Sequence, residues 1–202
     1  TGGAAIAAKR LMKSLQLLGL EVNMIVRDKL TVDENIYSIN ISFFQKGINF
    51  LRFIWERIVI YLNNQFKRRT LFQISIANTG TDLSDNRLIL EADIIHLHWI
   101  NQGFLSLSDI KKLTRLGKPI VWTMHDMWPC TGICHHSWGC LRFEDACGRC
   151  PFLMSTKEND LSSIGLGRKS FFRESNIQFV CVSSWLKNLA KESRITKENP
   201  IS

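Results

Sequence analysis

The sequence predicts an α/β fold in which a mostly parallel sheet carries helices on both faces. Short segments rich in β-branched and aliphatic residues alternate along the chain with segments whose apolar residues recur at helical spacing. This alternation is typical of parallel sheets, because the crossover between two parallel strands needs a helix. The pattern contains no internal repeat, and 202 residues suffice for one well-cored domain or for part of a larger protein.

The chain opens with a glycine pair in front of a helical segment. Gly2 and Gly3 precede residues 4–19, where Gly19 is a suitable C-cap and the apolar stripe is Ala7, Leu11, Leu15 and Leu18. Residues 21–26 then predict a strand, which makes a loop–helix–strand unit of Rossmann type. A glycine pair before a helix can present backbone amides to a phosphate or sugar oxygen, although it is more often only a tight turn.

Residues 48–69 are rich in aromatic and basic residues and predict a long helix. The segment is apolar over most of its circumference, and Arg52, Glu56 and Arg57 interrupt it. It is too charged and too short to span a bilayer. Two interpretations follow: a helix packed on the sheet with its basic end in water, or a helix lying on an anionic membrane surface.

Residues 93–99 predict a central strand that ends in polar residues. The strand brings His98, Trp99 and Asn101 to one edge of the sheet. His96 lies on the opposite face of the strand from Leu97, and we interpret it as a core histidine rather than a ligand.

Later segments continue the alternation. We expect Ser108 to cap a helix over residues 109–117 and residues 161–175 to be helical in their second half. Residues 178–183 predict another buried strand. Ser184 then begins a helix with three inward-facing residues, which are Trp185, Leu186 and Leu189.

The strand predicted over residues 120–124 carries the candidate reactive residue. It ends on His125 and Asp126, at the carboxyl edge where open α/β sheets bind their ligands. A histidine there can hydrogen-bond a sugar hydroxyl or the reacting centre, or it can be a loop residue that only caps the strand. The sequence shows no Ser–His–Asp order, nucleophile elbow or complete P-loop, so hydrolase and NTPase functions lack support.

Five of the six cysteines lie between residues 130 and 151, in what we define as the Cys-rich insert. Four of them follow the spacing C-x5-C-x6-C-x2-C, and these are Cys134, Cys140, Cys147 and Cys150. They could form a closed, structural tetrathiolate site with zinc as the default metal, and His135 or His136 could replace one thiolate. An iron–sulfur cluster, disulfides and unligated thiols are the alternatives. The clustering favours a metal site in a reducing compartment, and hence a cytoplasmic protein.

The formal charge of +8 suggests an anionic partner, such as a nucleotide or an acidic lipid surface. The alternative is that lysine and arginine only solvate helix faces. The basic residues are scattered apart from residues 67–69, and no RNA- or DNA-binding signature accompanies them. We therefore expect no nucleic-acid partner.

Together, four segments resemble the amino-terminal half of bacterial family 4 glycosyltransferases. They are IIHLHWINQGFLS (94–106), KPIVWTMHDMWPCTGICHH (118–136), CGRCP (147–151) and FVCVSSWLKNLA (179–190). The chain is most similar to the polysaccharide-assembly, colanic-acid-type group with an HDMWP…CxxCP segment. Cys130 departs from the pattern, since an aromatic residue is expected at that position.

This resemblance implies one lobe of the two-lobed GT-B fold, in which two Rossmann-like domains face each other across a cleft. It places Gly2 and Gly3 near the donor phosphate and acceptor, His125 against the transferred sugar, and Ser183 on the cleft wall. His98, Trp99, Asn101 and Asp126 would line the substrate site beside them. The implied reaction transfers a sugar, with retention, from a nucleotide-sugar donor to a glycan or lipid-linked acceptor in surface polysaccharide biosynthesis. The family needs no catalytic divalent metal.

On this resemblance, residues 1–202 are the acceptor-side domain, and the first strand and the carboxy-terminal donor-binding domain lie outside them. We therefore expect the chain alone to be inactive. A helix at residues 48–69 that docks on lipid would place the protein at the inner face of the cytoplasmic membrane. The alternative function, from another class, is a non-catalytic zinc-knuckle α/β module that binds a protein partner or an anionic membrane.

Overall fold

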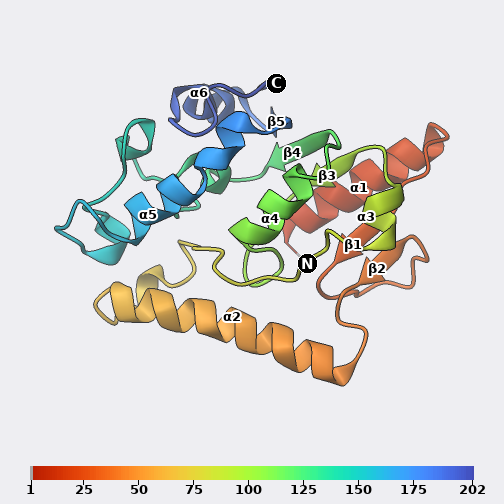
Figure 1. The fold of residues 1–202 in the computed structure, drawn as a ribbon, viewed down its shortest axis with the longest axis horizontal. Helices are drawn as coiled ribbons and strands as arrows, with labels where there is room; N and C mark the ends of the chain where they lie inside the picture. Colours follow the sequence, from red (N-terminus) through yellow and green to blue (C-terminus); the bar gives the residue numbers. More distant parts are fainter. Residues whose placement is uncertain (1) are drawn as a thin grey trace.

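A computed structural model describes residues 2–202 and confirms the expected α/β class, with parallel strands and helices on both sides (Figure 1). The strands are β1 (Met24–Val26), β2 (Ile36–Ser38), β3 (Ile95–Leu97), β4 (Ile120–Met124) and β5 (Ile177–Cys181). The α-helices are α1 (Gly3–Leu17), α2 (Phe43–Asn63), α3 (Arg87–Glu91), α4 (Leu107–Thr114), α5 (Leu161–Arg168) and α6 (Ser184–Glu192). Short 3-10 turns η1 to η5 occupy Arg68–Thr70, Trp128–Cys130, Arg142–Glu144, Pro151–Leu153 and Ser170–Glu174.

The strands form two parallel sheets rather than one. The first pairs β1 with β2, and the second has the order β3-β4-β5. β4 is therefore central in the second sheet, and the expectation that residues 93–99 form the central strand is wrong for the part of the chain described. β4 pairs with β5 along five residues, whereas β3 offers only three paired residues.

The main core lies around β4 and β5, and large aromatic side chains fill it. Trp122, Phe172 and Phe179 are at most 1% exposed, and the rings of Trp122 and Phe172 meet edge to face at 5.5 Å. Ile110 of α4 and Leu186 of α6 join the same cluster. This packing fixes the carboxyl ends of β3 and β4, where the polar residues lie.

Helix α1 buries a different face from the one predicted. Its buried residues are Ala8 and Met12, whereas Ala7 and Leu18 are exposed. The predicted helical spacing of the apolar residues is correct, but the segments that pack against the helix determine which of its faces is buried. Gly19 follows the helix with φ +84°, as expected of a terminating glycine.

Serine side chains cap two helices; the cap of α4 differs from the prediction, whereas α6 begins at Ser184 as predicted. Ser106, not Ser108, caps α4, and Asp109 completes a capping box with it. Ser183 caps α6 by accepting a hydrogen bond from a backbone amide. Trp185 is 52% exposed, so its predicted inward orientation is wrong.

Helix α5 occupies the first half of residues 161–175, where a helix was predicted only in the second half. Two glycines lower the helix propensity of this half, but Gly165 is required by packing. A Cβ at Gly165 would lie 2.5 Å from the carbonyl oxygen of Gly132. Asp160 caps the helix through two backbone amides, so the cap and the close packing outweigh the propensity.

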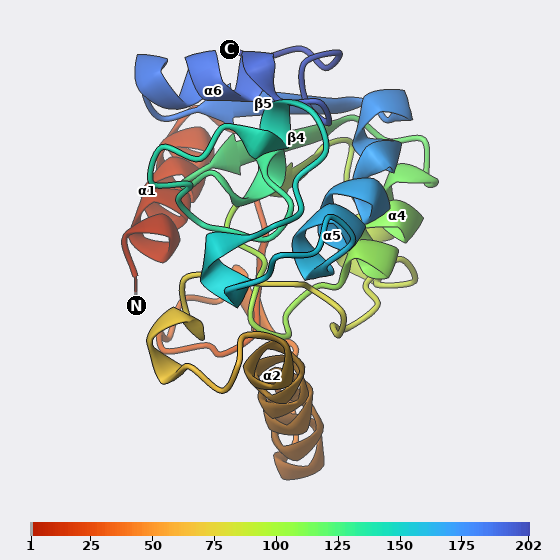
Figure 2. The same ribbon diagram turned by 90° about the vertical axis from the view of Figure 1, so that its left-hand side faces the viewer.

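Helix α2 projects from the body of the molecule along one side (Figures 1 and 2). Its buried residues are mainly polar, namely Asn49, Glu56 and Arg57 with Ile60, while its outer side carries exposed aromatic and aliphatic residues. The interpretation of a helix packed on the sheet did not anticipate this inverted polarity, whereas a helix on a membrane surface would expose such an apolar face. No helix among residues 2–202 is long and apolar enough to cross a membrane.

Candidate functional site

The carboxyl edge of β3 and β4 gathers five of the predicted site residues around one small cavity. The cavity has a volume of about 10 Å³. Its polar lining residues are His98, Trp99, Asn101, His125 and Asp126. The parallel pairing of β3 with β4 brings the two strand ends to the same place, as the sequence analysis expected.

Two histidines at this edge form a direct hydrogen bond. Nδ1 of His98 lies 2.9 Å from Nε2 of His125, so one of these nitrogens donates and the other accepts. The ring of His96 stacks on that of His98 at 4.5 Å, and its Nε2 lies 2.8 Å from the hydroxyl of Thr123. His96 is exposed, so its interpretation as a core histidine is wrong.

The surroundings of this histidine pair favour its neutral form. Burial, together with the charges that His96 and His125 carry when protonated, lowers the pKa of His98 to about 4. Burial also lowers the pKa of His125, and the Asp126 carboxylate opposes that shift. A neutral imidazole can both donate and accept, which suits a hydroxyl-rich ligand.

The low pKa of His98 predicts loss of stability in mild acid. Below its ordinary pKa of 6.5 the unfolded chain binds a proton that the folded state resists down to about pH 4, so the free energy of unfolding should fall between these values. Thermal denaturation across this range measures the effect, and His98→Gln should flatten the curve. The exposed His136→Gln variant is the control and should keep the steeper profile. Equal slopes for all three proteins would contradict the assignment.

Asp126 is held by three donors from different parts of the chain. Its oxygens accept from the Trp128 backbone at 2.9 Å and from Nε1 of Trp99 at 3.2 Å, and Nδ1 of His135 lies 2.7 Å away. Nε2 of His135 lies 2.9 Å from the hydroxyl of Ser75. Ser75 is fully buried, so this Ser–His–Asp chain cannot present a nucleophile and instead fixes Asp126.

His135 is the site residue that sequence reasoning assigned differently. It was considered as a replacement zinc ligand, whereas in the structure it bridges Asp126 and Ser75. The bridge depends on contact with residues 73–76, since the His135 backbone N–H donates to the carbonyl of Gln73. Ser75 is 60 positions away along the chain, and no local motif signals this contact.

Asn101 offers an unused acceptor to the cavity. The side chain is 4% exposed, and its Oδ1 has no hydrogen-bond partner within residues 2–202. Since buried polar atoms are normally paired, this oxygen is available to a ligand donor. Gly2, Gly3 and Ser183 do not line this cavity: the glycines begin α1, and Ser183 caps α6.

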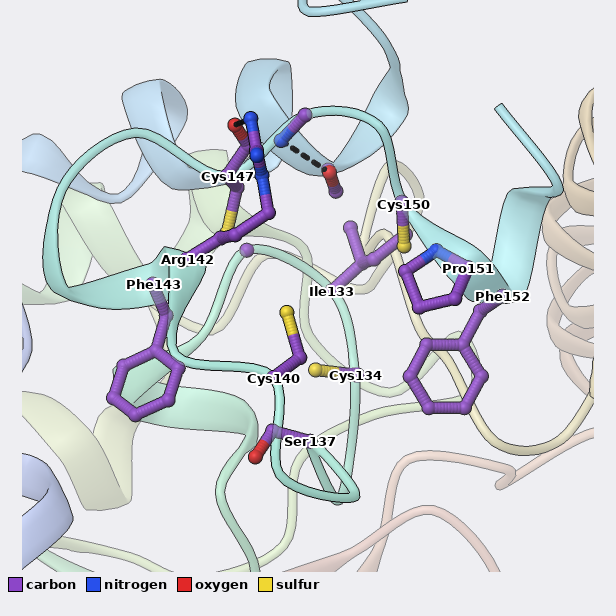
Figure 3. Close-up of a pocket in the computed structure, with 13 residues that line it drawn as sticks. Ile133, Cys134, Ser137, Cys140, Arg142, Phe143, Cys147, Cys150, Pro151 and Phe152 are labelled. Atoms are coloured by element: carbon purple, nitrogen blue, oxygen red, sulfur yellow. Dashed lines mark hydrogen bonds between the residues drawn. The ribbon is translucent and has the colours of Figure 1, made fainter. Parts of the chain in front are cut away.

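The four spaced cysteines line a second cavity, within the Cys-rich insert (Figure 3). Its volume is about 20 Å³. All six cysteines are free thiols, so the structure describes no disulfide among residues 2–202. No three His, Cys, Asp or Glu side chains in that range are arranged to hold a metal ion as they stand.

Comparisons with known proteins agree with the architecture. The family described as Glycosyltransferase Family 4 matches residues 1–201. The chain is also similar to WcaC of Escherichia coli (strain K12), whose name describes a colanic acid biosynthesis glycosyl transferase, with 28% identity over 91 residues. This match covers 43% of the chain and 22% of WcaC. No solved structure matches the chain significantly.

Proposed function

The chain belongs to Glycosyltransferase Family 4, and from this premise we propose that it is the acceptor-side domain of a retaining glycosyltransferase. The donor is a nucleotide sugar, and the acceptor is a glycan or lipid-linked glycan of surface polysaccharide biosynthesis. The name of WcaC supports the biosynthetic context. The observation that carries the proposal is the neutral His98–His125 pair at the carboxyl edge of the sheet.

The cavity at this edge has the hydrogen-bonding groups that a sugar requires. His125 is partly exposed at the end of β4, and Asn101 presents a free carbonyl oxygen beside it. Trp99, which is 38% exposed at this edge, contributes an aromatic surface of the kind on which apolar sugar faces pack. In this proposal His125 contacts the transferred sugar, while Asp126 and His98 hold the strand end in place.

The proposal also accounts for the two separate sheets. In a doubly wound fold the strand order is 3-2-1-4-5, so the first strand lies between the second and the fourth. Here β1 lies on the β3 side of its sheet (Figure 1), and both sheets contribute to one core: Leu97 of β3 is part of it, and Ile25 of β1 packs against it. A parallel strand preceding Gly2 would join β1 to β3. The donor-binding domain would follow residue 202.

Incubation of the complete protein with nucleotide sugars tests the function. Release of nucleoside diphosphate that depends on an acceptor extract supports it, and NMR of the product reports whether the anomeric configuration is retained. Absence of turnover with every nucleotide sugar would favour the non-catalytic zinc-knuckle module that binds a protein or membrane.

Peripheral contact with an anionic membrane through residues 48–69 forms a second part of the proposal. The outer side of α2 exposes large apolar residues, including Phe50 at 62%, Leu51 at 66% and Trp55 at 55%. Lys67, Arg68 and Arg69 lie a few residues beyond the end of the helix at Asn63. An apolar face next to basic residues is the usual composition of an interfacial helix. This would bring the protein to the inner face of the cytoplasmic membrane.

Vesicle co-sedimentation tests this contact. We expect binding to vesicles that contain anionic lipid, weaker binding at high salt, and no binding to neutral vesicles. Substituting both Leu51→Ser and Trp55→Ser should reduce binding by about tenfold or more, because each removes exposed apolar area. The matched control is Trp138→Ser, which removes a 75% exposed tryptophan from the Cys-rich insert and should bind normally. Equal loss in both proteins, or binding that ignores lipid charge, would contradict the proposal.

A further inference from the structure

The Cys-rich insert needs a source of order that its secondary structure does not supply. Between β4 and α5 only three 3-10 turns interrupt the irregular chain. Its buried apolar residues pack against other segments: Ile133 and Cys150 join a small cluster with Ile60, Ile74 and Ile76, and Phe143 joins the main core. Long loops without secondary structure are uncommon in compact domains, and a metal can replace a missing core.

We propose that Cys134, Cys140, Cys147 and Cys150 form a structural tetrathiolate zinc site, with Lys169 as the buried counter-charge. The four thiols line the same cavity, and Figure 3 shows their sulfur atoms turned toward its interior. No aspartate, glutamate or histidine lines this cavity. A site made only of sulfur is closed to substrate, so the metal stabilises the fold and takes no part in catalysis.

The backbone between the last two cysteines is bent into an unusual conformation. Cys147, Gly148 and Arg149 have φ values of 55°, 89° and 44°. A Cβ at Gly148 would lie 2.2 Å from the carbonyl oxygen of Glu158, so only glycine fits there. Two non-glycine residues with positive φ are costly and persist where the surroundings require them. The bend turns both sulfurs of the C-x2-C pair to one cavity, as a zinc knuckle requires.

Lys169 is a fully buried cation without a carboxylate partner within residues 2–202. Its Nζ donates to the carbonyls of Trp128 at 2.5 Å and Thr131 at 2.9 Å and lies over the Trp128 ring. Burial lowers the pKa of Lys169 to about 7, and the nearby cysteine thiols, Cys130 first and then Cys134 and Cys147, oppose that shift. An unpaired buried charge is expensive. A tetrathiolate zinc carries net negative charge and would compensate it.

Metal binding requires the sulfurs to move closer together than they are in the structure. The cavity, about 20 Å³, has room for one water-sized particle. Zinc–sulfur bonds measure about 2.3 Å, so the turns that carry the cysteines must close around the ion. The one helical element between Cys134 and Cys150 is the short 3-10 turn η3, so no α-helix or strand there opposes this closure.

Elemental analysis of the purified protein tests the site. We expect about one zinc per chain. The double variant Cys147→Ser/Cys150→Ser should lose the metal, and the matched control Cys181→Ser, on β5 outside the cavity, should retain it. A folded protein without zinc, zinc retained by the double variant, or iron with inorganic sulfide in its place would each overturn the proposal.

Two measurements on the unaltered sequence remain decisive if the double variant does not fold. Cobalt exchanged for zinc should give the intense thiolate charge-transfer absorption of a tetrahedral sulfur site. Alkylation followed by mass spectrometry should show the four cysteines protected until a chelator is added. Lys169→Met should weaken zinc binding by about 10- to 100-fold, as expected for a residue outside the ligand set. If a folded Lys169→Met protein bound zinc with unchanged affinity, Lys169 would not be the counter-charge of the site.

Discussion

His125→Ala should reduce the kcat of the complete protein by about 100-fold or more, the range of a residue that acts on the reacting centre. The imidazole stands at the end of β4 with one nitrogen bonded to His98, so its other nitrogen is free for the sugar. Burial lowers the pKa of His125, which favours a neutral ring that can exchange hydrogen bonds with a hydroxyl. Initial rates of nucleoside diphosphate release measure the effect.

His96→Ala is the matched control for this prediction. His96 belongs to the same histidine stack but is exposed at the outer end of it, so its removal should leave kcat within about twofold. Melting temperatures of both variants establish that each is folded. If His125→Ala turns over at the rate of the unaltered protein, the histidine only caps the strand, and the catalytic assignment is wrong.

Glu56→Ala should lower the free energy of unfolding by about 3–5 kcal/mol, the usual cost of removing one partner from a buried ion pair. Glu56 is completely buried, and one carboxylate oxygen accepts hydrogen bonds from the backbone amides of Ile76 and Ala77, each at 2.8 Å. The other oxygen lies 2.7 Å from Nη2 of Arg57, without the geometry of a hydrogen bond. The substitution leaves two amides without their acceptor and a buried guanidinium without its counter-charge. Denaturant-induced unfolding measures this change in the free energy of unfolding.

Glu91→Ala is the control, because the Arg87–Glu91 pair is an exposed i, i+4 pair. Such pairs contribute about 0.3–0.5 kcal/mol, so the control should unfold almost as the parent protein does. Glu56→Gln keeps one oxygen that can accept from the amides, so its free energy of unfolding should lie between those of Glu56→Ala and Glu91→Ala. Equal stability of Glu56→Ala and Glu91→Ala would show that the buried pair does not anchor α2.

The buried pair also explains the unusual orientation of α2. Because Glu56 satisfies the amides of residues 76–77 and Arg57 donates to the carbonyls of Leu71 and Ile74, the polar face of the helix must point inward. The apolar face then remains outside, which is the basis of the proposed membrane contact. Variants that test stability and variants that test vesicle binding can therefore be chosen on opposite faces of α2.

The proposed zinc site and the proposed sugar site make separate predictions. The cysteines line a different cavity from His98 and His125, and His135 connects the two regions through Asp126. A metal-free but active protein would leave the glycosyltransferase proposal intact. An inactive protein that holds zinc would favour the non-catalytic module.

The sequence alone determined the α/β class and which polar residues meet at the sheet edge. These features follow from local patterns: residues 120–124 are strand formers, and the carboxyl ends of parallel strands lie at one edge, so His98, Asn101 and His125 were correctly brought together. Local periodicity predicts that a segment is helical or extended, because side-chain spacing depends only on neighbouring residues.

Only the tertiary structure decided which face each element buries and which distant residues pair. Met12 rather than Leu18 is buried in α1, and α2 turns its polar face inward, because partners far along the chain select the face. The contact of His135 with Ser75 and Asp126 arises in the same way, from two segments that meet only after folding. Such contacts gain their free energy from long-range packing and hydrogen bonding, which no window of sequence contains.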